Sequence, residues 1–297
     1  MRIQIISHNR EKNPDTIKMR WHWLPLYFEE FGHEVDHVFK QDWKYFYLRY
    51  LKFKPDVLIS VGPIAFIPSL MKKMRLIRAP HVHDWTDDNV DINGKEHGIT
   101  KMALYEYFTV ENADYITTPS VFKKERCELW DKPVFYVPHG VNPDFDEVEP
   151  AELEGNVKIL YSGEQSRRKR VDRLNDVVTF LTRPIPNHEM PALYAECDLY
   201  VQPSIVEPYG IAVLEAMACG KPVVGTGVGG MLDTVEDGET GFLVESMDSR
   251  GLAEQIIMLS DPGLRGEFGR AARERMEGKF DWRCIADGYL EVIDAIG

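Results

Sequence analysis

Two glutamates flank the start of a short apolar segment, and their spacing suits a nucleotide ligand. Glu207 and Glu215 lie in the string PSIVEPYGIAVLEAMACGKPVV. We expect a helix over residues 209–219, because Pro208 is tolerated in a first helical turn and Gly220 ends a helix. The N–H groups at a helix start lack intrahelical partners and carry partial positive charge, so they suit a diphosphate.

The expected ligand contacts follow from this helix. Its first N–H groups would belong to Tyr209, Gly210 and Ile211, and Gly210 allows close approach to the backbone. Glu215 lies one turn after Ile211 and one turn before Ala218, on an apolar stripe. A buried carboxylate needs hydrogen-bond donors, and a ribose diol supplies two. The segment therefore indicates a sugar-nucleotide site.

The complete string resembles the signature of retaining glycosyltransferases of family 4, E-x-[FY]-G-x-x-x-x-E-A-M-A-x-G-x-P-V-V. Residues 207–224 follow it at every specified position. The resemblance implies that Glu207 contacts the donor sugar and Glu215 the ribose. The alternative is that the two glutamates simply face the solvent. Two glutamates eight residues apart are not specific, but the full string is far more so.

Other segments extend the resemblance along most of the chain. Residues 31–35, 54–57, 112–120 and 137–142 resemble the acceptor domain, and 80–84 resemble the segment with the active-site histidine, here His83. The resemblance implies an α/β protein of GT-B fold, with two Rossmann-like domains facing a cleft that holds the donor. A satisfied structural histidine is the alternative for His83.

A basic segment is expected to grip the diphosphate. Residues 163–172, GEQSRRKRVD, resemble the family's loop after the first donor-domain strand, with Lys169 as the matching lysine and Arg168 beside it. Arg183, near the segment that borders the base, completes the donor-binding set. Glu164 stands where the family usually has arginine, and a solvated basic helix start remains open.

In two further places the chain lacks a feature that the family usually has. The segment HNREKNPDT, residues 8–16, lacks the family's paired glycines. The helix expected at 171–176 leads almost directly into a strand, so the C-terminal donor domain is predicted to be cut down.

Alternating strand and helix patterns indicate parallel sheets. We expect an acceptor-side domain at 1–145, a nucleotide-sugar-binding domain at 146–281, and a C-terminal helix, 282–297, packing back toward the first. Strands are predicted at 2–7, 34–39, 57–61, 79–83, 115–118, 135–138, 157–162, 178–181, 199–203, 223–226 and 241–244. Helices are predicted at 17–31, 100–112, 249–259, 263–278 and 282–296.

Three motifs point to other chemistry. His33 and His37 form H-E-x-x-H, but a strand would hold them about 13 Å apart, too far to share zinc. Residues 225–230 contain G-x-G-x-x-G without room for a crossover helix, so we expect a loop lining the sugar or phosphate. His81, His83, Asp84, Asp87 and Asp88 have metal-ligand character, but no partner cluster completes a shell. We therefore predict no metal and no cofactor beyond a UDP- or GDP-sugar co-substrate.

The amino-acid composition bears on the class of partner and on the cellular compartment. The net charge of -13 argues against general nucleic-acid binding. The four cysteines are widely spread and the N-terminus resembles a strand, so we expect a cytoplasmic protein.

One basic and aromatic region suggests a membrane partner. Residues 40–83 contain nine basic and two acidic residues. In a helix over 42–54, Trp43, Phe46, Tyr47, Tyr50 and Leu51 would pack on the sheet. Tyr45 and Leu48 would remain exposed, and the basic residues proposed to meet an anionic membrane are Lys44, Arg49, Lys52, Lys72 and Lys73. A solvated basic edge is the alternative.

We predict a retaining, metal-independent glycosyltransferase that moves a sugar from a nucleoside-diphosphate sugar to a hydroxyl acceptor on a glycan, glycolipid or lipid carrier. Its catalytic residues would be His83, Glu207 and Lys169. A catalytically silent nucleotide-sugar-binding protein and a GT-B-fold epimerase remain alternatives.

Overall fold

The chain forms two compact α/β units. The computed structural model describes residues 1–7, 20–62, 65–85, 101–121, 124–125, 131–146, 148, 157–162, 178–181 and 185–296. One unit comprises Met1–Pro138 and Ile285–Gly297, and the other comprises His139–Cys284. Residues 139–145 belong to the second unit, rather than the first as expected, because the N–H of Val141 donates to the carbonyl of Phe280 (2.9 Å).

The first unit contains a six-stranded parallel sheet. Its strands are β1 (Arg2–Ser7), β2 (Glu34–Phe39), β3 (Val57–Val61), β4 (His81–Asp84), β5 (Tyr115–Thr118) and β6 (Val134–Tyr136). Their order is β2-β1-β3-β4-β5-β6, with every described ladder parallel. Strand β3 is buried along its whole length, as expected for a strand covered on both faces.

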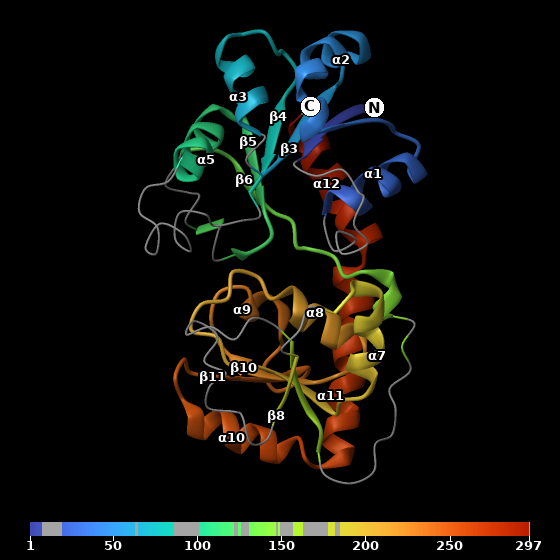
Figure 1. Ribbon diagram of the computed structural model, residues 1–297, viewed down its shortest axis with the longest axis vertical. Helices are drawn as coiled ribbons and strands as arrows, with labels where there is room; N and C mark the ends of the chain where they lie inside the picture. The colour runs from blue at the N-terminus through green and yellow to red at the C-terminus, as the bar shows by residue number, and fades with distance from the viewer. Residues whose placement is uncertain are drawn as a thin grey trace. The chain divides into compact units, whose positions relative to one another are not determined.

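Helices lie on both sides of this sheet. They are α1 (Arg20–Glu30), α2 (Phe46–Phe53), α3 (Phe66–Lys73), α5 (Lys101–Asn112) and most of α12 (Trp282–Ile296). Figure 1 shows α3 and α5 on one side of the strands and α1 and α12 on the other. Phe66 of α3 contacts Phe108 of α5, and Phe28 of α1 contacts Tyr289 of α12.

The second unit contains a five-stranded parallel sheet. Its strands are β7 (Ile159–Ser162), β8 (Val178–Leu181), β9 (Leu199–Gln202), β10 (Val223–Thr226) and β11 (Gly241–Val244). The strand order is β11-β10-β9-β7-β8. From β7 the chain adds β8 on one side and then β9, β10 and β11 on the other, so a topological switch point lies between β7 and β9. Ligands of open parallel sheets bind beyond the carboxyl ends of strands at such a switch point.

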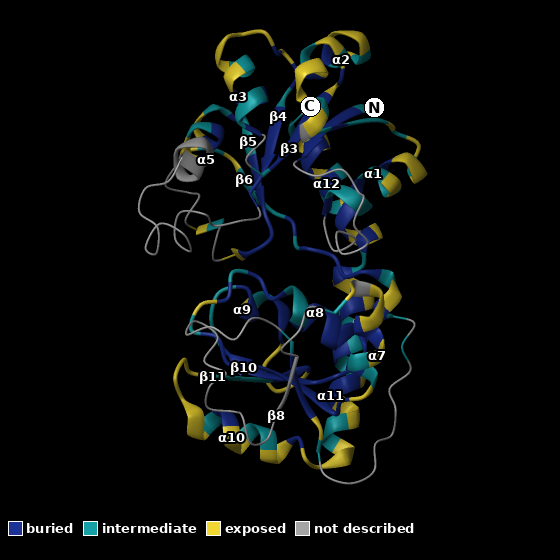
Figure 2. Cartoon of the chain, in the orientation of Figure 1, coloured by how far each residue is buried: buried dark blue, intermediate teal, exposed yellow. Residues whose placement is uncertain are grey.

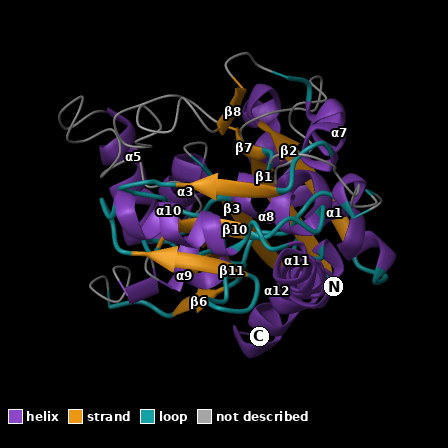
Figure 3. Cartoon of the chain, turned by 90° about the horizontal axis from the view of Figure 1, so that it is seen from below, coloured by secondary structure: helices purple, strands orange, loops and turns teal. Residues whose placement is uncertain are grey.

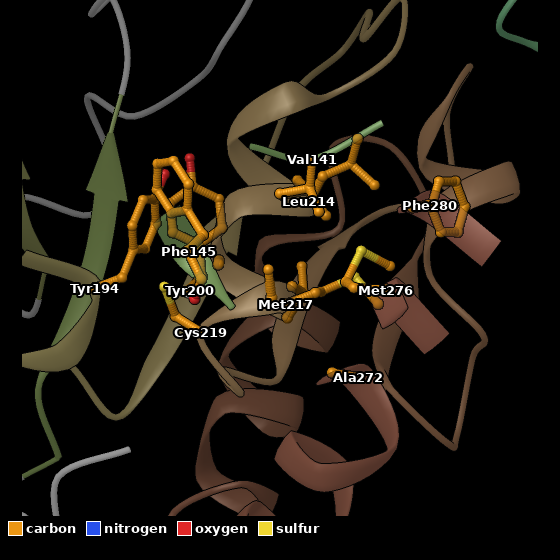
Figure 4. Packing of buried hydrophobic residues seen from close by; sticks show 14 of the residues in the cluster. Val141, Phe145, Tyr194, Tyr200, Leu214, Met217, Cys219, Ala272, Met276 and Phe280 are labelled. Carbon is orange, nitrogen blue, oxygen red and sulfur yellow. Dashed lines mark hydrogen bonds between the residues drawn. The ribbon is translucent and has the colours of Figure 1, made fainter. Parts of the chain in front are cut away.

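Two apolar cores cover this sheet. Its helices are α7 (Met190–Ala195), α8 (Ile211–Ala218), α9 (Met231–Thr234), α10 (Ser249–Met258) and α11 (Pro262–Arg275), with short turns at Pro143–Phe145, Asn187–Glu189 and Met276–Phe280. Tyr194, Leu214 and Phe145 belong to the core that contains α7 and α8 (Figure 4). Leu252 and Phe268 belong to the opposite core. Strand β10 is buried along its whole length (Figure 2), and Figure 3 marks the helices and strands of the chain by colour.

Most of the expected strands agree with the structure, but some helices differ. The helix expected at 209–219 begins only at Ile211, and the helix expected at 263–278 changes at Met276 to a π-helical turn. Helices α3, α7 and α9 were not predicted. Residues 171–176 lie outside the described part of the chain.

Candidate functional site

The loop between β9 and α8 ends at a glycine with a left-handed backbone. Gly210 has φ 90° and ψ 51° and is the N-cap of α8, and its carbonyl accepts from the N–H of Val213 (2.9 Å). Because a positive φ cannot continue a right-handed helix, Pro208 and Tyr209 lie in the loop. The expectation that Tyr209 supplies a helical N–H is therefore wrong, and the helical N–H groups begin at Ile211.

Glu207 is held in that loop by side chains at the end of β9. Only 6% of Glu207 is exposed. Its Oε2 accepts from Nε2 of Gln202 (2.6 Å) and from Oγ of Ser204 (3.1 Å). Two donors fix the carboxylate plane before any ligand binds, which favours a positioned contact over a mobile surface charge.

The glycine-rich segment after β10 packs against the backbone of the Glu207 loop. The N–H of Gly230 donates to the carbonyl of Glu207 (3.0 Å). A Cβ at Gly229 would lie 2.1 Å from that carbonyl oxygen, and one at Gly230 would lie 2.4 Å from Cα of Tyr209. The two glycines therefore permit this close packing, a role distinct from the expected lining of the sugar or phosphate.

Glu215 projects from the middle of α8 into a buried environment. It is 2% exposed, and its Oε2 accepts from the phenol of Tyr194 (3.0 Å). Burial raises the pKa of Tyr194, so the phenol keeps its proton and remains a donor. The protein thus supplies one donor of the kind that we expected from a ribose.

Tyr209 is anchored to the beginning of the second unit. Its hydroxyl accepts from the N–H of His139 (2.7 Å) and donates to the carbonyl of the same residue (3.1 Å). The two rings also lie 5.8 Å apart between centroids. This side chain therefore fixes the loop that carries Glu207.

His83 lies on β4 of the first unit, near the carboxyl end of the strand. Its Nδ1 is 3.1 Å from Oγ of Ser60, which also lies 2.7 Å from Nε2 of His81. Burial lowers the pKa of His83 to about 4, so the imidazole is neutral near pH 7. A neutral ring can donate or accept one hydrogen bond, as sugar binding requires.

Asp84 belongs to a buried ion pair. Its Oδ1 accepts from Nη1 of Arg20 (3.0 Å), from Thr117 (2.9 Å) and from Tyr289. In the described residues, no group of three or more His, Cys, Asp or Glu could hold a metal ion. His33 and His37 flank or occupy strand β2, as predicted for H-E-x-x-H here.

Several predicted site residues lie outside the described part of the chain. These are Arg168, Lys169 and Arg183, together with the candidate metal ligands Asp87 and Asp88. Their assignment stays a prediction from the sequence. His83 falls in one unit and Glu207 and Glu215 fall in the other.

The sequence interpretation missed the residues that hold the two glutamates. Tyr200 and Gln202 alternate along β9 and share a face, a signal that could have placed them beside Ser204. No local pattern links Tyr194 to Glu215, which lies on another helix.

Comparison with known proteins finds a matching family model and similar proteins. Residues 145–275 match the family model described as glycosyl transferases group 1. The chain is 38% identical over 123 residues to alpha-maltose-1-phosphate synthase of Mycolicibacterium smegmatis, covering 39% of this chain and 32% of that protein. It is 40% identical over 119 residues to D-inositol 3-phosphate glycosyltransferase of Arthrobacter sp., covering 40% and 28%. The chain thus spans about a third of the length of these relatives.

Solved structures match over nearly the whole chain. Sucrose-phosphate synthase of Thermosynechococcus elongatus aligns with a TM-score of 0.78 at 18% identity, covering 99% of this chain and 98% of that one. HepE of Anabaena in complex with UDP-glucose aligns with a TM-score of 0.72 at 17% identity, covering 99% and 100%. The fold is therefore GT-B, as the sequence resemblance implied.

Proposed function

We propose that this chain, which carries a glycosyl transferases group 1 domain in residues 145–275, transfers a glycosyl unit from a nucleoside-diphosphate sugar to a hydroxyl acceptor with retention of configuration. The observation that carries the proposal is the pair of buried carboxylates, Glu207 and Glu215, on either side of Gly210. They follow β9, which borders the switch point of the sheet, where parallel sheets bind nucleotides.

The proposed donor contacts divide between the two carboxylates. Glu215 would accept from the ribose hydroxyls, and Glu207 would accept from hydroxyls of the transferred sugar. The N–H groups that begin at Ile211, with Arg168 and Lys169, would hold the diphosphate. The UDP-glucose complex of HepE supports a nucleotide-sugar donor for this fold.

The proposed reaction breaks the bond between the anomeric carbon and the diphosphate oxygen. The acceptor oxygen forms its new bond on the same face, and its proton passes to the departing diphosphate. Negative charge develops on that diphosphate, so cations and helix N–H groups that bind it stabilise the transition state. His83 would bind the sugar as a neutral imidazole. Because Arg168 and Lys169 would supply the positive charge, we propose that no metal is needed.

A donor panel tests the proposal. Wild-type protein is incubated with UDP-, GDP- and ADP-sugars, with and without saccharide and lipid-linked acceptors, and products are resolved by mass spectrometry. We expect acceptor-dependent transfer by one donor class, an α-anomeric product from an α-donor by NMR, and unchanged activity in excess EDTA. Binding without turnover favours a silent binding protein, and donor conversion without acceptor favours an epimerase.

We also propose that helices α2 and α3 meet an anionic membrane surface. Trp43, Tyr45, Leu48 and Leu51 are 47%, 60%, 64% and 48% exposed. The burial expected for Trp43 and Leu51 is therefore wrong. A 3-10 turn over Lys40–Tyr45 shifts Trp43 off the helical stripe, and α2 ends at Phe53, close after Leu51.

The basic part of this surface is smaller than expected. Lys44, Lys52 and Lys73 are exposed. Arg49 pairs with Asp36, and Lys72 pairs with Asp114 at 2.6 Å. Their charges are partly offset, so Lys44, Lys52 and Lys73 carry the proposed attraction, each contributing about 1 kcal/mol near anionic lipid.

Neither helix spans a bilayer. Among the described helices, none is long and apolar enough to cross one. We propose peripheral attachment from the cytoplasmic side, with a lipid or lipid-linked acceptor.

Sedimentation with vesicles tests the attachment. We expect binding to phosphatidylserine vesicles at low salt, with the Lys44→Glu/Lys52→Glu variant and the Leu48→Ser/Leu51→Ser variant both losing most of it. Lys158→Glu, an exposed lysine in the other unit, serves as the charge control. Binding by neither wild type nor control would leave a water-soluble acceptor as the better proposal.

A further inference from the structure

A continuous set of polar side chains, all buried except the half-buried Ser162, joins the two glutamates across the switch point of the second sheet. We call it the β7–β9 network, and its members are Ser162, Tyr194, Tyr200, Gln202 and Ser204. Ser162 ends β7 and Gln202 ends β9, and Tyr200 lies two residues before Gln202 on the same face. Ser162, Tyr200 and Gln202, from the two strands that border the switch point, thus converge where a ligand is expected.

The first half of the network leads to Glu207. Nε2 of Gln202 donates to Oε2 of Glu207, and Oε1 of Gln202 accepts from the hydroxyl of Tyr200 (3.1 Å). Ser204 supplies a second donor to the same carboxylate oxygen. Loss of the Tyr200 hydroxyl would therefore leave the amide of Gln202 less firmly oriented, while Ser204 remains in place.

The second half leads to Glu215. The hydroxyl of Tyr194 lies 3.0 Å from Oε2 of Glu215 and 2.9 Å from Oγ of Ser162. Ser162 Oγ in turn lies 3.3 Å from the hydroxyl of Tyr200. The rings of Tyr194 and Tyr200 pack together, with centroids 5.8 Å apart. Figure 4 shows both rings beside Phe145.

The polarity of the network follows from its two ends. A carboxylate only accepts, so the hydrogens of Tyr194 and of the Gln202 amide point outward, toward Glu215 and Glu207. Burial also raises the pKa of Tyr200, which keeps that phenol protonated. Each hydroxyl has one hydrogen to donate, and that of Tyr200 has a choice of acceptor: Oε1 of Gln202 (3.1 Å), or the carbonyl (3.1 Å) or Oγ (3.3 Å) of Ser162. Reorienting one member therefore changes what its neighbour can donate to or accept.

We propose that Tyr194, Tyr200 and Gln202 are positioning residues that couple the two carboxylates, so that a nucleotide bound at Glu215 favours the sugar-binding orientation of Glu207. This inference rests on the proposed donor site. Tyr194 acts on the nucleotide half, Gln202 acts on the sugar half, and Tyr200 links them. A purely structural role would affect both halves alike.

The test compares two affinities for each variant by calorimetry. Wild type is first screened with UDP-, GDP- and ADP-glucose and the free diphosphates, and the pair that binds is used. Tyr200→Phe and Gln202→Leu should leave the affinity for the free diphosphate within about twofold, yet weaken the nucleotide sugar about fivefold or more. Tyr194→Phe should weaken both ligands.

A control variant and a double-mutant cycle complete the experiment. Tyr161→Phe removes a buried phenol from the opposite face of β7 and should change neither affinity. Glu215→Gln combined with Tyr200→Phe should weaken nucleotide-sugar binding non-additively, by about threefold or more. Additive effects, or equal loss for both ligands in Tyr200→Phe, overturn the coupling. Failure of wild type to bind any of the six ligands overturns the proposed function instead.

Discussion

At the scale of single residues, the two glutamates are expected to do separable work. Glu215→Ala should weaken the free diphosphate and the nucleotide sugar by about 10- to 100-fold, because the ribose contact is present with either ligand. Glu207→Ala should chiefly lower kcat, since its contact with the sugar changes during transfer. Calorimetry and initial rates separate the two effects. Equal diphosphate binding by wild type and Glu215→Ala would contradict the first assignment.

His83 gives the molecule a predicted acid sensitivity. Its pKa is about 4 in the folded chain because of burial, and about 6.5 when unfolded. The unfolded state therefore binds more protons between these values, so the free energy of unfolding falls as pH drops from 6.5 toward 4. The loss should approach roughly 3 kcal/mol for this residue.

Urea unfolding at pH 7 and pH 4.5 measures that sensitivity. His83→Gln should show a smaller difference between the two pH values than wild type. His188→Gln replaces an exposed histidine and should behave as wild type does. An unchanged pH dependence in His83→Gln would show that other groups cause it.

The sequence predicts the two glutamates but not the side chains that hold them. Glu207 and Glu215 stand in one continuous string, so their types and spacing are visible locally. Tyr194 reaches Glu215 only because α7 packs beside α8 in the folded unit. Hydrogen-bond partners of that kind depend on tertiary packing, which no local sequence pattern reveals.

At the scale of elements, strands were predicted better than helix starts. Strand β3 is a short, fully buried Val-rich run, and such runs are read directly from hydropathy. The start of α8 was placed too early because Pro208 suits a first helical turn. Gly210 decides the boundary through its positive φ, which a helical propensity does not reveal.

The glycine-rich segment after β10 offers a prediction about that loop. Gly230→Ala would place Cβ 2.4 Å from Cα of Tyr209, so the loop with Glu207 must shift. We expect a stability loss of about 1–3 kcal/mol and a larger loss in sugar-dependent affinity. Gly227→Ala is the matched control, since its nearest contact would be 3.5 Å from Leu232. Urea unfolding and calorimetry check both, and a normal affinity in Gly230→Ala would separate this packing from the site.

At the scale of the whole molecule, the chain builds its first unit from both ends. A helix returning to the first domain was expected from residue 282, and residues from Ile285 onward belong to that unit. Trp282 stays with the second unit, where a Cβ at Gly140 would overlap its ring. The sequence shows an amphipathic helix here, but the exact crossing depends on which core receives each side chain.

The buried ion pair between Arg20 and Asp84 allows a test of whether the two units unfold independently. Helix α1, strand β4 and helix α12 meet there, since Tyr289 also donates to Asp84. Asp84→Ala would leave the guanidinium of Arg20 buried without that carboxylate, at a cost of about 3–5 kcal/mol. Glu254→Ala breaks an exposed ion pair and should cost little. Because Glu215 lies in the other unit, Asp84→Ala should keep its affinity for the free diphosphate at 10 °C, measured by calorimetry beside urea unfolding. Parallel loss of stability and diphosphate affinity would mean that the units fold as one.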